Sequence, residues 1–165
     1  MLSERLLTRV VRLCTDQYLK LKPTDETHVP APEPGKRYML YAHVPFCERL
    51  CPYCSFNRFP YAEDRARPYF QNMRREMRML KDLGYEFESL YVGGGTPVAL
   101  PVKELERVLK AIGRHDTEYT VEAGRPDCIT EENVALLAEY GVNRVCVNPQ
   151  TFNDKTLERL GRKHT

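Results

Sequence analysis

The sequence predicts an α/β fold in which short parallel strands alternate with helices. Four short segments rich in aromatic and β-branched residues have the composition of strands, at 38–44, 88–92, 118–122 and 142–148. Each is followed by a segment with the apolar spacing or the end signals of a helix, at 61–83, 101–114, 130–140 and 154–160. Such alternation favours right-handed parallel crossovers, and functional residues then gather at the carboxyl ends of the strands.

Composition places the chain among globular proteins. Its 165 residues, 42% apolar and 29% charged, suffice for one domain with a core. Acidic and basic residues are interspersed, so no basic stripe marks a nucleic-acid partner. No apolar run approaches the roughly 18 residues of a membrane span, and residues 1–11 lack the apolar core of a signal peptide. We therefore expect a cytoplasmic protein without a membrane span.

The N-terminal part is predicted to be separate from the main domain. Residues 1–21 have the pattern of an amphipathic helix, with leucines and a valine on one face and basic residues elsewhere. We expect this helix to pack on the main domain, although a basic amphipathic helix also suits a membrane surface or a partner. Residues 22–36 contain four prolines, which favours an extended linker, so the main domain is expected at 37–165.

The first predicted strand leads into three closely spaced cysteines, Cys47, Cys51 and Cys54. A loop with this CxxxCxxC spacing can bind three irons of a cubic iron–sulfur cluster and leave the fourth iron without a protein ligand. A zinc site is the alternative, with His43 as the fourth ligand, and unligated thiols are another. Disulfides are disfavoured because the number of close cysteines is odd. We expect Cys128 and Cys146 to pack in the core.

Polar or glycine-rich segments follow the other three strands as well. The second strand ends in Gly93–Gly95, which would let backbone amides approach a ligand or would simply form a tight turn. Glu122 and Gly124 end the third strand, and residues 148–150 follow the fourth. Because all of these positions are strand ends, we expect the segments to form one site.

Four motifs in this order resemble one family. HVPFCERLCPYCSF, YVGGGTP, TVEAGRPD and the segment 141–165 are similar to the radical S-adenosylmethionine (SAM) enzymes, in the branch of oxygen-independent coproporphyrinogen III dehydrogenase. The resemblance covers residues 38–165 and implies a partial (β/α) barrel of the TIM type. About four of six βα units would be present, so the chain would be a truncated fragment or one piece of a split protein, with the remainder of the barrel as a possible partner.

The resemblance also implies the cofactors and their ligands. Cys47, Cys51 and Cys54 would bind a [4Fe–4S] cluster, while no catalytic residue is assigned. Eight further residues match positions that contact SAM: Tyr41, Tyr53, Gly94, Gly95, Thr96, Glu122, Gln150 and Arg162. Judged alone, Glu122 could be an ordinary strand-end carboxylate, Gln150 a turn residue and Arg162 a solvated cation at a helix end.

For activity, the resemblance implies oxidative decarboxylation of coproporphyrinogen III to protoporphyrinogen IX in anaerobic haem biosynthesis. An electron donor such as flavodoxin or ferredoxin would then be a partner. The dehydrogenase has a further cysteine two positions beyond the third, where this chain has Phe56. In this respect the loop is closer to the haem-chaperone branch and to the shorter coproporphyrinogen-dehydrogenase-like proteins, and TVEAGRPD favours the latter. The tetrapyrrole partner would therefore be either a porphyrinogen substrate or haem. A stable inactive fragment, with an empty or zinc-filled loop, is the third alternative.

Overall fold

The computed structural model describes residues 2–19 and 28–165. The chain divides into two compact units, Met1–Pro30 and Ala31–Thr165. The first contains one helix, α1 (Leu2–Tyr18), within the predicted range 1–21. The predicted packing of this helix on the main domain stays a prediction. Of the predicted linker, residues 22–27 lie outside the described residues, and residues 28–36 contain no helix or strand.

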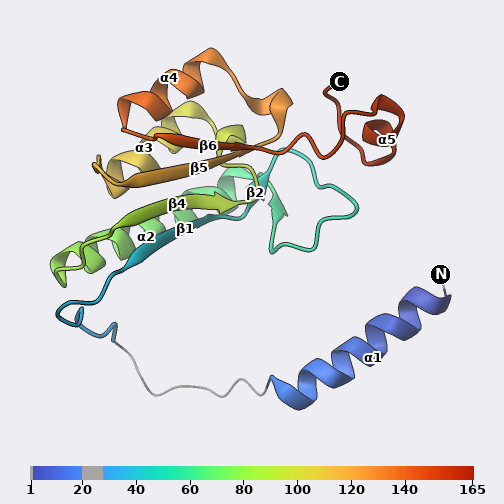
Figure 1. The fold of residues 1–165 in the computed structure, drawn as a ribbon, viewed down its shortest axis with the longest axis horizontal. Coiled ribbons are helices and arrows are strands. Elements are labelled where there is room, and N and C mark those ends of the chain that lie inside the picture. The colour runs from blue at the N-terminus through green and yellow to red at the C-terminus, as the bar shows by residue number, and fades with distance from the viewer. Residues whose placement is uncertain (1, 20–27) are drawn as a thin grey trace. The chain divides into compact units, whose positions relative to one another are not determined.

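The second unit is built on a four-stranded parallel sheet (Figure 1), as predicted. The strand order is β1 (Met39–Val44), β4 (Ser89–Gly94), β5 (Glu118–Gly124) and β6 (Arg144–Val147). Helices follow in alternation: α2 (Glu63–Asp82), α3 (Val102–Ile112), α4 (Glu131–Glu139) and α5 (Asp154–Arg159). The strands follow one another across the sheet in the same order as along the chain, and each is joined to the next through a helix. Within residues 28–165 the sheet is open, with β1 and β6 at its edges.

The two faces of the sheet differ in burial. In β1 the residues Leu40, Ala42 and Val44 are buried, while the intervening Tyr41 and His43 are not. Helices α2, α3 and α4 pack beside one another in chain order and cover the first of these faces (Figure 1), where the core lies. The other face is therefore open and carries polar and aromatic side chains.

The observed ends of β4 and β5 and the observed start of β6 each differ from the prediction by two residues. Strands β4 and β5 extend two residues further than predicted, through Gly94 and Gly124. Gly93 and Gly94 stay in register with His43 and Val44, so the glycines continue the pairing with β1 instead of ending it. Strand β6 begins later than predicted, because Asn143 binds Tyr119 through its backbone N–H and its side-chain oxygen.

The cysteine loop is closed at its base by a second, very short sheet. Strand β2 (Phe46–Cys47) pairs with β3 (Phe59–Pro60), and the amide of Tyr61 donates to the carbonyl of Cys47 over 2.8 Å. Phe46 is buried and packs edge-on against the rings of Tyr61, which precedes α2, and of Tyr69, which belongs to α2. The loop is thus anchored to the core on both sides of its cysteines.

None of the helices in the described residues combines the length and the apolar character needed to cross a bilayer.

Candidate functional site

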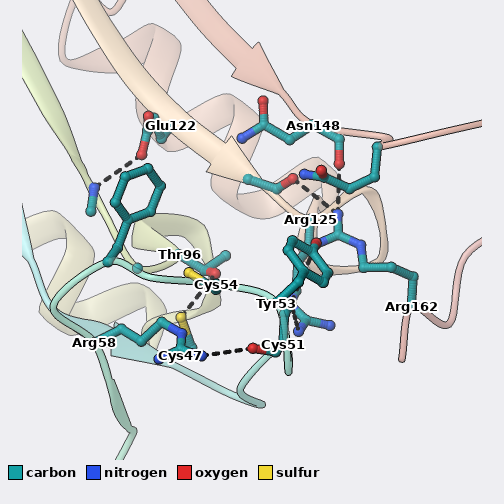
Figure 2. A pocket seen from close by; sticks show the side chains of 15 residues that line it. Cys47, Cys51, Tyr53, Cys54, Arg58, Thr96, Glu122, Arg125, Asn148 and Arg162 are labelled. Carbon is teal, nitrogen blue, oxygen red and sulfur yellow. Dashed lines mark hydrogen bonds between the residues drawn. The ribbon is translucent and has the colours of Figure 1, made fainter. Parts of the chain in front are cut away.

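The four strand ends meet around one cavity, shown in Figure 2. Ten of the eleven residues predicted for the site line it: Cys47, Cys51, Tyr53, Cys54, Gly94, Gly95, Thr96, Glu122, Gln150 and Arg162. Nine of them come from the loop after β1 and from the ends of β4, β5 and β6, as parallel-sheet geometry predicts, and Arg162 comes from the segment after α5. The predicted segments therefore line a single cavity, as binding of a common cofactor by their residues would require.

Tyr41 is the predicted residue that does not line the cavity. Its side chain is 55% exposed on the open face of β1. The ring lies 5.9 Å from the ring of Tyr91, and the hydroxyl oxygen lies 2.8 Å from Nδ1 of His43. Tyr41 therefore belongs to the open face beside the cavity, where a ligand larger than the cavity would extend.

The glycine triplet brings backbones together. A Cβ at Gly95 would come within 2.5 Å of the carbonyl oxygen of Phe46, so a larger residue cannot fit there. The three amides of Gly94, Gly95 and Thr96 all bind within the protein, to Glu122 Oε2, Val44 O and Phe46 O respectively. The expectation that these amides would face a ligand is wrong for this arrangement, since the packing of β4 against the loop consumes them. The Thr96 side chain lines the cavity, and its hydroxyl donates to the sulfur of Cys47 over 3.6 Å.

Glu122 is held firmly at the mouth of the cavity. Its Oε1 accepts a hydrogen bond of 2.6 Å from the hydroxyl of Tyr91, and its Oε2 accepts one of 2.9 Å from the amide of Gly94. Burial, followed by the hydrogen bond and charge of Glu122, raises the pKa of Tyr91. Tyr91 therefore stays a donor at every physiological pH, and the carboxylate keeps one orientation.

The thiols lie in different electrostatic environments. Burial raises the pKa of Cys47, whose sulfur lies 3.6 Å from the Thr96 hydroxyl. Burial also acts to raise the pKa of Cys51, but hydrogen bonds from Tyr53 and Arg162 and the charge of Arg125 outweigh it. The net pKa of Cys51 is therefore below its ordinary value. A thiolate at Cys51 is thus favoured, as metal ligation requires.

Two buried arginines stand beside this thiol. Arg125, only 2% exposed, donates from Nη2 to the sulfur of Cys51 over 2.9 Å. Arg162, 8% exposed, donates to the carbonyl of Asn148 over 2.6 Å. Sequence analysis predicted Arg162 but assigned nothing to Arg125. Its position next to a glycine at a strand end was the signal that could have found it.

Gln150 occupies an unusual backbone conformation in the cavity wall. Its φ of 68° is left-handed, which non-glycine residues adopt rarely and at a cost. The backbone on its N-terminal side is fixed, because Asn148 N donates to Gly124 O and His164 Nε2 lies 3.0 Å from Pro149 O. The surrounding contacts therefore impose the conformation that turns Gln150 towards the cavity.

The donor set fits a cubic cluster better than a single ion. Within residues 28–165, no three Cys, His, Asp or Glu side chains come close enough together to bind one metal ion. His43, the fourth zinc ligand considered above, has Nδ1 beside the Tyr41 hydroxyl and Nε2 3.1 Å from the Asn57 carbonyl. In a cubic cluster each thiolate binds a different iron, so the three cysteine sulfurs can lie further apart than the ligands of a single metal ion.

Cys128 and Cys146 differ in placement. Cys128 is buried in the core, as predicted, but Cys146 does not belong to the core cluster. Cys146 pairs in register with Glu122 and is half-buried. The prediction for Cys146 is wrong because the sheet face that carries Glu122 is open.

Comparison with known proteins decides the family. The model of the radical SAM superfamily matches residues 41–165, which is most of the chain. The chain belongs to the radical SAM superfamily. Members of this superfamily bind a [4Fe–4S] cluster and SAM, and these are the cofactors of the domain.

Relatives place the chain near the coproporphyrinogen oxidase-like proteins. It is 34% identical over 76% of its length to the "Oxygen-independent coproporphyrinogen-III oxidase-like protein HemZ" of Bacillus subtilis, of which it covers 28%. It is 35% identical over 75% of its length to the "Heme chaperone HemW" of the same organism, of which it covers 35%. The solved structure of the radical SAM enzyme coproporphyrinogen III oxidase (HemN) from Escherichia coli matches 79% of the chain with a TM-score of 0.69 and 27% identity, and 32% of that protein is covered. The chain therefore spans about a third of the length of these relatives.

Proposed function

We propose that this chain is the cofactor-binding part of a radical SAM oxidoreductase that decarboxylates coproporphyrinogen III to protoporphyrinogen IX. The observation that carries the proposal is the convergence of the cysteine loop with the ends of β4, β5 and β6 around one cavity. Similarity to the oxidase-like protein HemZ and to HemN supports the choice of substrate.

The residues of the cavity have separate roles in this proposal. Cys47, Cys51 and Cys54 hold the cluster, and no fourth protein thiol is supplied by the loop. When bound, the cluster supplies the electron that cleaves SAM and generates a carbon-centred radical. Glu122 presents a fixed carboxylate to the positively charged SAM, and the carbonyls beside Gly95 accept from its amino group.

Other residues that line the cavity would orient the bound cofactors and exclude water from the cluster. Arg162 spans the ends of β5 and β6, since its Nη2 lies 3.3 Å from Gly124 O and 2.6 Å from Asn148 O. Tyr53 and Phe56 line the cavity beside the cysteines, where their rings limit contact of the cluster with solvent. We propose flavodoxin or ferredoxin as the electron donor, and Gln150 and Tyr41 as contacts to the outer part of SAM.

A haem-trafficking protein is the second candidate. Phe56 stands where the dehydrogenase pattern has a further cysteine, and the similarity to the haem chaperone HemW is as strong as that to HemZ. In this case the domain would keep its cofactors and bind haem without decarboxylating a porphyrinogen.

Reconstitution of the cluster tests the common part of both proposals, and cleavage of SAM tests the radical proposal. The full chain is purified and reconstituted anaerobically with iron and sulfide, reduced with dithionite, and assayed for 5′-deoxyadenosine. We expect iron, sulfide and 5′-deoxyadenosine in wild type and Cys14→Ser, and their loss in Cys51→Ser, because Cys14 lies outside the loop. Wild-type protein that carries the cluster and never cleaves SAM would contradict the radical proposal.

Addition of a tetrapyrrole separates the two candidates. We expect coproporphyrinogen III to yield CO2 and protoporphyrinogen IX in the loaded protein. Stoichiometric binding of haem with no turnover of the porphyrinogen would select the haem-trafficking function. Because the chain spans about a third of the length of these relatives, the same assay is run in parallel with the full-length relative HemZ of Bacillus subtilis.

A further inference from the structure

Arg125 is a buried cation whose hydrogen-bonding capacity is only partly used. Its side chain is 2% exposed, and Nη2 donates to the sulfur of Cys51 and to the carbonyl of Arg49. Nη1 is buried and has no protein partner within the described residues. No carboxylate of residues 28–165 forms an ion pair with Arg125. An isolated buried guanidinium is costly unless an anion or acceptor compensates it.

The nearest acceptor of this guanidinium is a cluster ligand. The 2.9 Å contact from Arg125 to Cys51 Sγ is much shorter than the contacts of Thr96 Oγ1 with Cys47 Sγ, 3.6 Å, and of Arg162 Nη1 with Cys51 Sγ, 3.9 Å. Among the described hydrogen bonds to the three cysteine sulfurs, Arg125 therefore makes the closest one from a charged group.

Other charges around the loop are already engaged. Arg49 forms an ion pair with Asp127 over 2.6 Å, so a carboxylate compensates its charge. Arg58 donates to the backbone carbonyl of Cys51 over 2.6 Å, and Arg162 binds two backbone carbonyls. Within residues 28–165, Arg58 and Arg162 also lack a carboxylate partner, and each has a buried Nε without a hydrogen bond. Arg125 differs from them in its 2.9 Å contact with a cysteine sulfur and in having a whole terminal nitrogen, Nη1, without a protein partner in the described residues.

The local fold fixes the direction of Arg125. Gly124 has φ of 64°, and the amide of Arg125 donates back to Ala123 O over 2.7 Å, so the chain turns sharply at the end of β5. Pro126 then begins a short 3-10 helix, Pro126–Cys128, whose Cys128 amide donates to Arg125 O. A rigid turn on both sides points the side chain into the cavity wall, as Figure 2 shows.

We propose that Arg125 is a positioning residue that binds Cys51 and donates its free Nη1 to a sulfur of the cluster, thereby raising the reduction potential of the cluster. Three thiolates outweigh the positive charge of the cluster core, so the unit is anionic and becomes more so on reduction. A buried cation and hydrogen bonds to sulfur stabilise the reduced state more than the oxidised one. The inference rests on the cluster-binding part of the proposed function.

The test measures the cluster potential without SAM or substrate. Wild type, Arg125→Gln, Arg125→Lys and the control Arg74→Gln are reconstituted anaerobically and titrated with dithionite while the reduced cluster is followed by electron paramagnetic resonance. Arg74 is a largely buried arginine that pairs with Glu104 over 2.7 Å and does not line the cavity. It controls for the loss of one arginine charge elsewhere.

A hydrogen bond to a charged group contributes about 1.5–3 kcal/mol, which is tenfold or more in an equilibrium constant. We expect Arg125→Gln to lower the equilibrium constant of reduction about tenfold, a negative shift of about 59 mV for a one-electron couple. Arg125→Lys keeps the positive charge but loses the planar set of guanidinium N–H donors, so we expect a smaller shift of the reduction potential. We expect Arg74→Gln to have the reduction potential of wild type.

Each outcome decides the inference. Fully loaded Arg125→Gln with the potential of wild type overturns it, while the cluster assignment stands. Loss of iron in Arg125→Gln with unchanged circular dichroism supports the positioning of Cys51. If Arg125→Gln does not fold, Arg125→Lys decides, and an unchanged potential there overturns the proposal. Wild-type protein without a cluster would refute the proposed function itself.

Discussion

At the scale of single residues, long-range partners decide what each group of the cavity does. The three cysteines were predictable because their spacing is local and belongs to one loop. Arg125 was not, because its partner Cys51 lies 74 positions away in the chain. The same holds for the amides of Gly94, Gly95 and Thr96, whose acceptors lie in β5, β1 and β2 respectively. Local pattern identifies residue types at a site, and only packing shows which donors are still free.

Glu122→Gln is expected to weaken SAM binding at least tenfold. The substitution keeps the shape of the side chain but removes the charge that faces a cationic ligand, and charge-assisted hydrogen bonds contribute about 1.5–3 kcal/mol. Equilibrium dialysis of the cluster-loaded protein measures the affinity. Tyr91→Phe is the comparison, since it removes only the donor to Oε1 and leaves the contact with Gly94. Equal affinities of wild type and Glu122→Gln would remove Glu122 from the SAM site.

Cys128 is expected to make stability fall at alkaline pH. Burial, followed by the charges of Asp127 and Glu48, raises the pKa of the Cys128 thiol from 9.0 to about 11. Between these values the unfolded chain releases the proton while the folded chain retains it. The stabilisation is therefore complete below about pH 9 and is lost as pH rises towards about 11.

Urea unfolding of wild type and Cys128→Ser across this pH range isolates the effect of Cys128. We expect the free energy of unfolding of wild type to fall more steeply than that of the serine variant, which does not titrate there. Parallel pH profiles would show that the thiol has the same pKa in both states.

At the scale of elements, the strands and helices were predictable because each has a periodic pattern. Helix α2 was predicted at 61–83 and is observed at Glu63–Asp82, with its apolar stripe in the core. Strands β2 and β3 were not predicted, since two residues each are too short to show a period. Their pairing depends on the contact of Phe46 with α2, which no local pattern contains. The closure of the cysteine loop is therefore a tertiary effect.

The start of α4 is expected to stabilise the site through Asn133. Thr130 and Asn133 form a capping box, and the buried Asn133 side chain also donates to Val98 O and Cys128 O. These carbonyls belong to the segments after β4 and β5, so one amide group joins the two segments behind the site. Asn133→Ala leaves both buried carbonyls without this donor, which costs about 2–4 kcal/mol of unfolding free energy.

Thr130→Ala is the matched variant, because it removes the cap and leaves the two buried carbonyls bonded. Loss of an N-cap side chain costs about 1 kcal/mol. Chemical denaturation of both variants gives the comparison. A loss in Asn133→Ala no larger than that in Thr130→Ala would show that the link between the two segments contributes nothing.

At the scale of the whole molecule, the alternation of elements predicted the parallel sheet and the edge at which the site lies. The main core cluster of the described residues comes from positions 40–142, with Leu157 buried outside it, and the chain divides between Pro30 and Ala31. The predicted boundary of the main domain at residue 37 came from proline content alone, and it stays a proposal. Composition shows where a chain does not form regular structure, whereas a domain limit depends on contacts that composition does not contain.

Removal of residues 1–30 is expected to leave the main unit intact. The core cluster of Ala31–Thr165 is built from residues of this unit. We expect a chain that begins at Ala31 to match the full chain in thermal midpoint and in iron bound after reconstitution. A drop of several degrees in the midpoint would show instead that α1 packs on this unit and stabilises it.

The open edge of the sheet is expected to make the 165-residue chain associate with itself. Strand β6 is an edge strand in the described sheet, and an unpaired edge can pair with another chain. Val145 stays 42% exposed although its partner in register, Val121, is fully buried. Apolar surface on a free strand edge favours association, because a second chain can form backbone hydrogen bonds with the strand and bury its apolar side chains.

Val145→Lys is therefore expected to reduce concentration-dependent association, measured by sedimentation velocity over a hundredfold range of protein concentration. Val134→Lys is the matched control, since Val134 is 46% exposed but lies on helix α4, where its amide donates to Thr130 O. If both lysine variants reduce association equally, general charge repulsion is the cause and the strand edge is not. A chain that is monomeric over the whole range without any substitution would show that β6 does not pair.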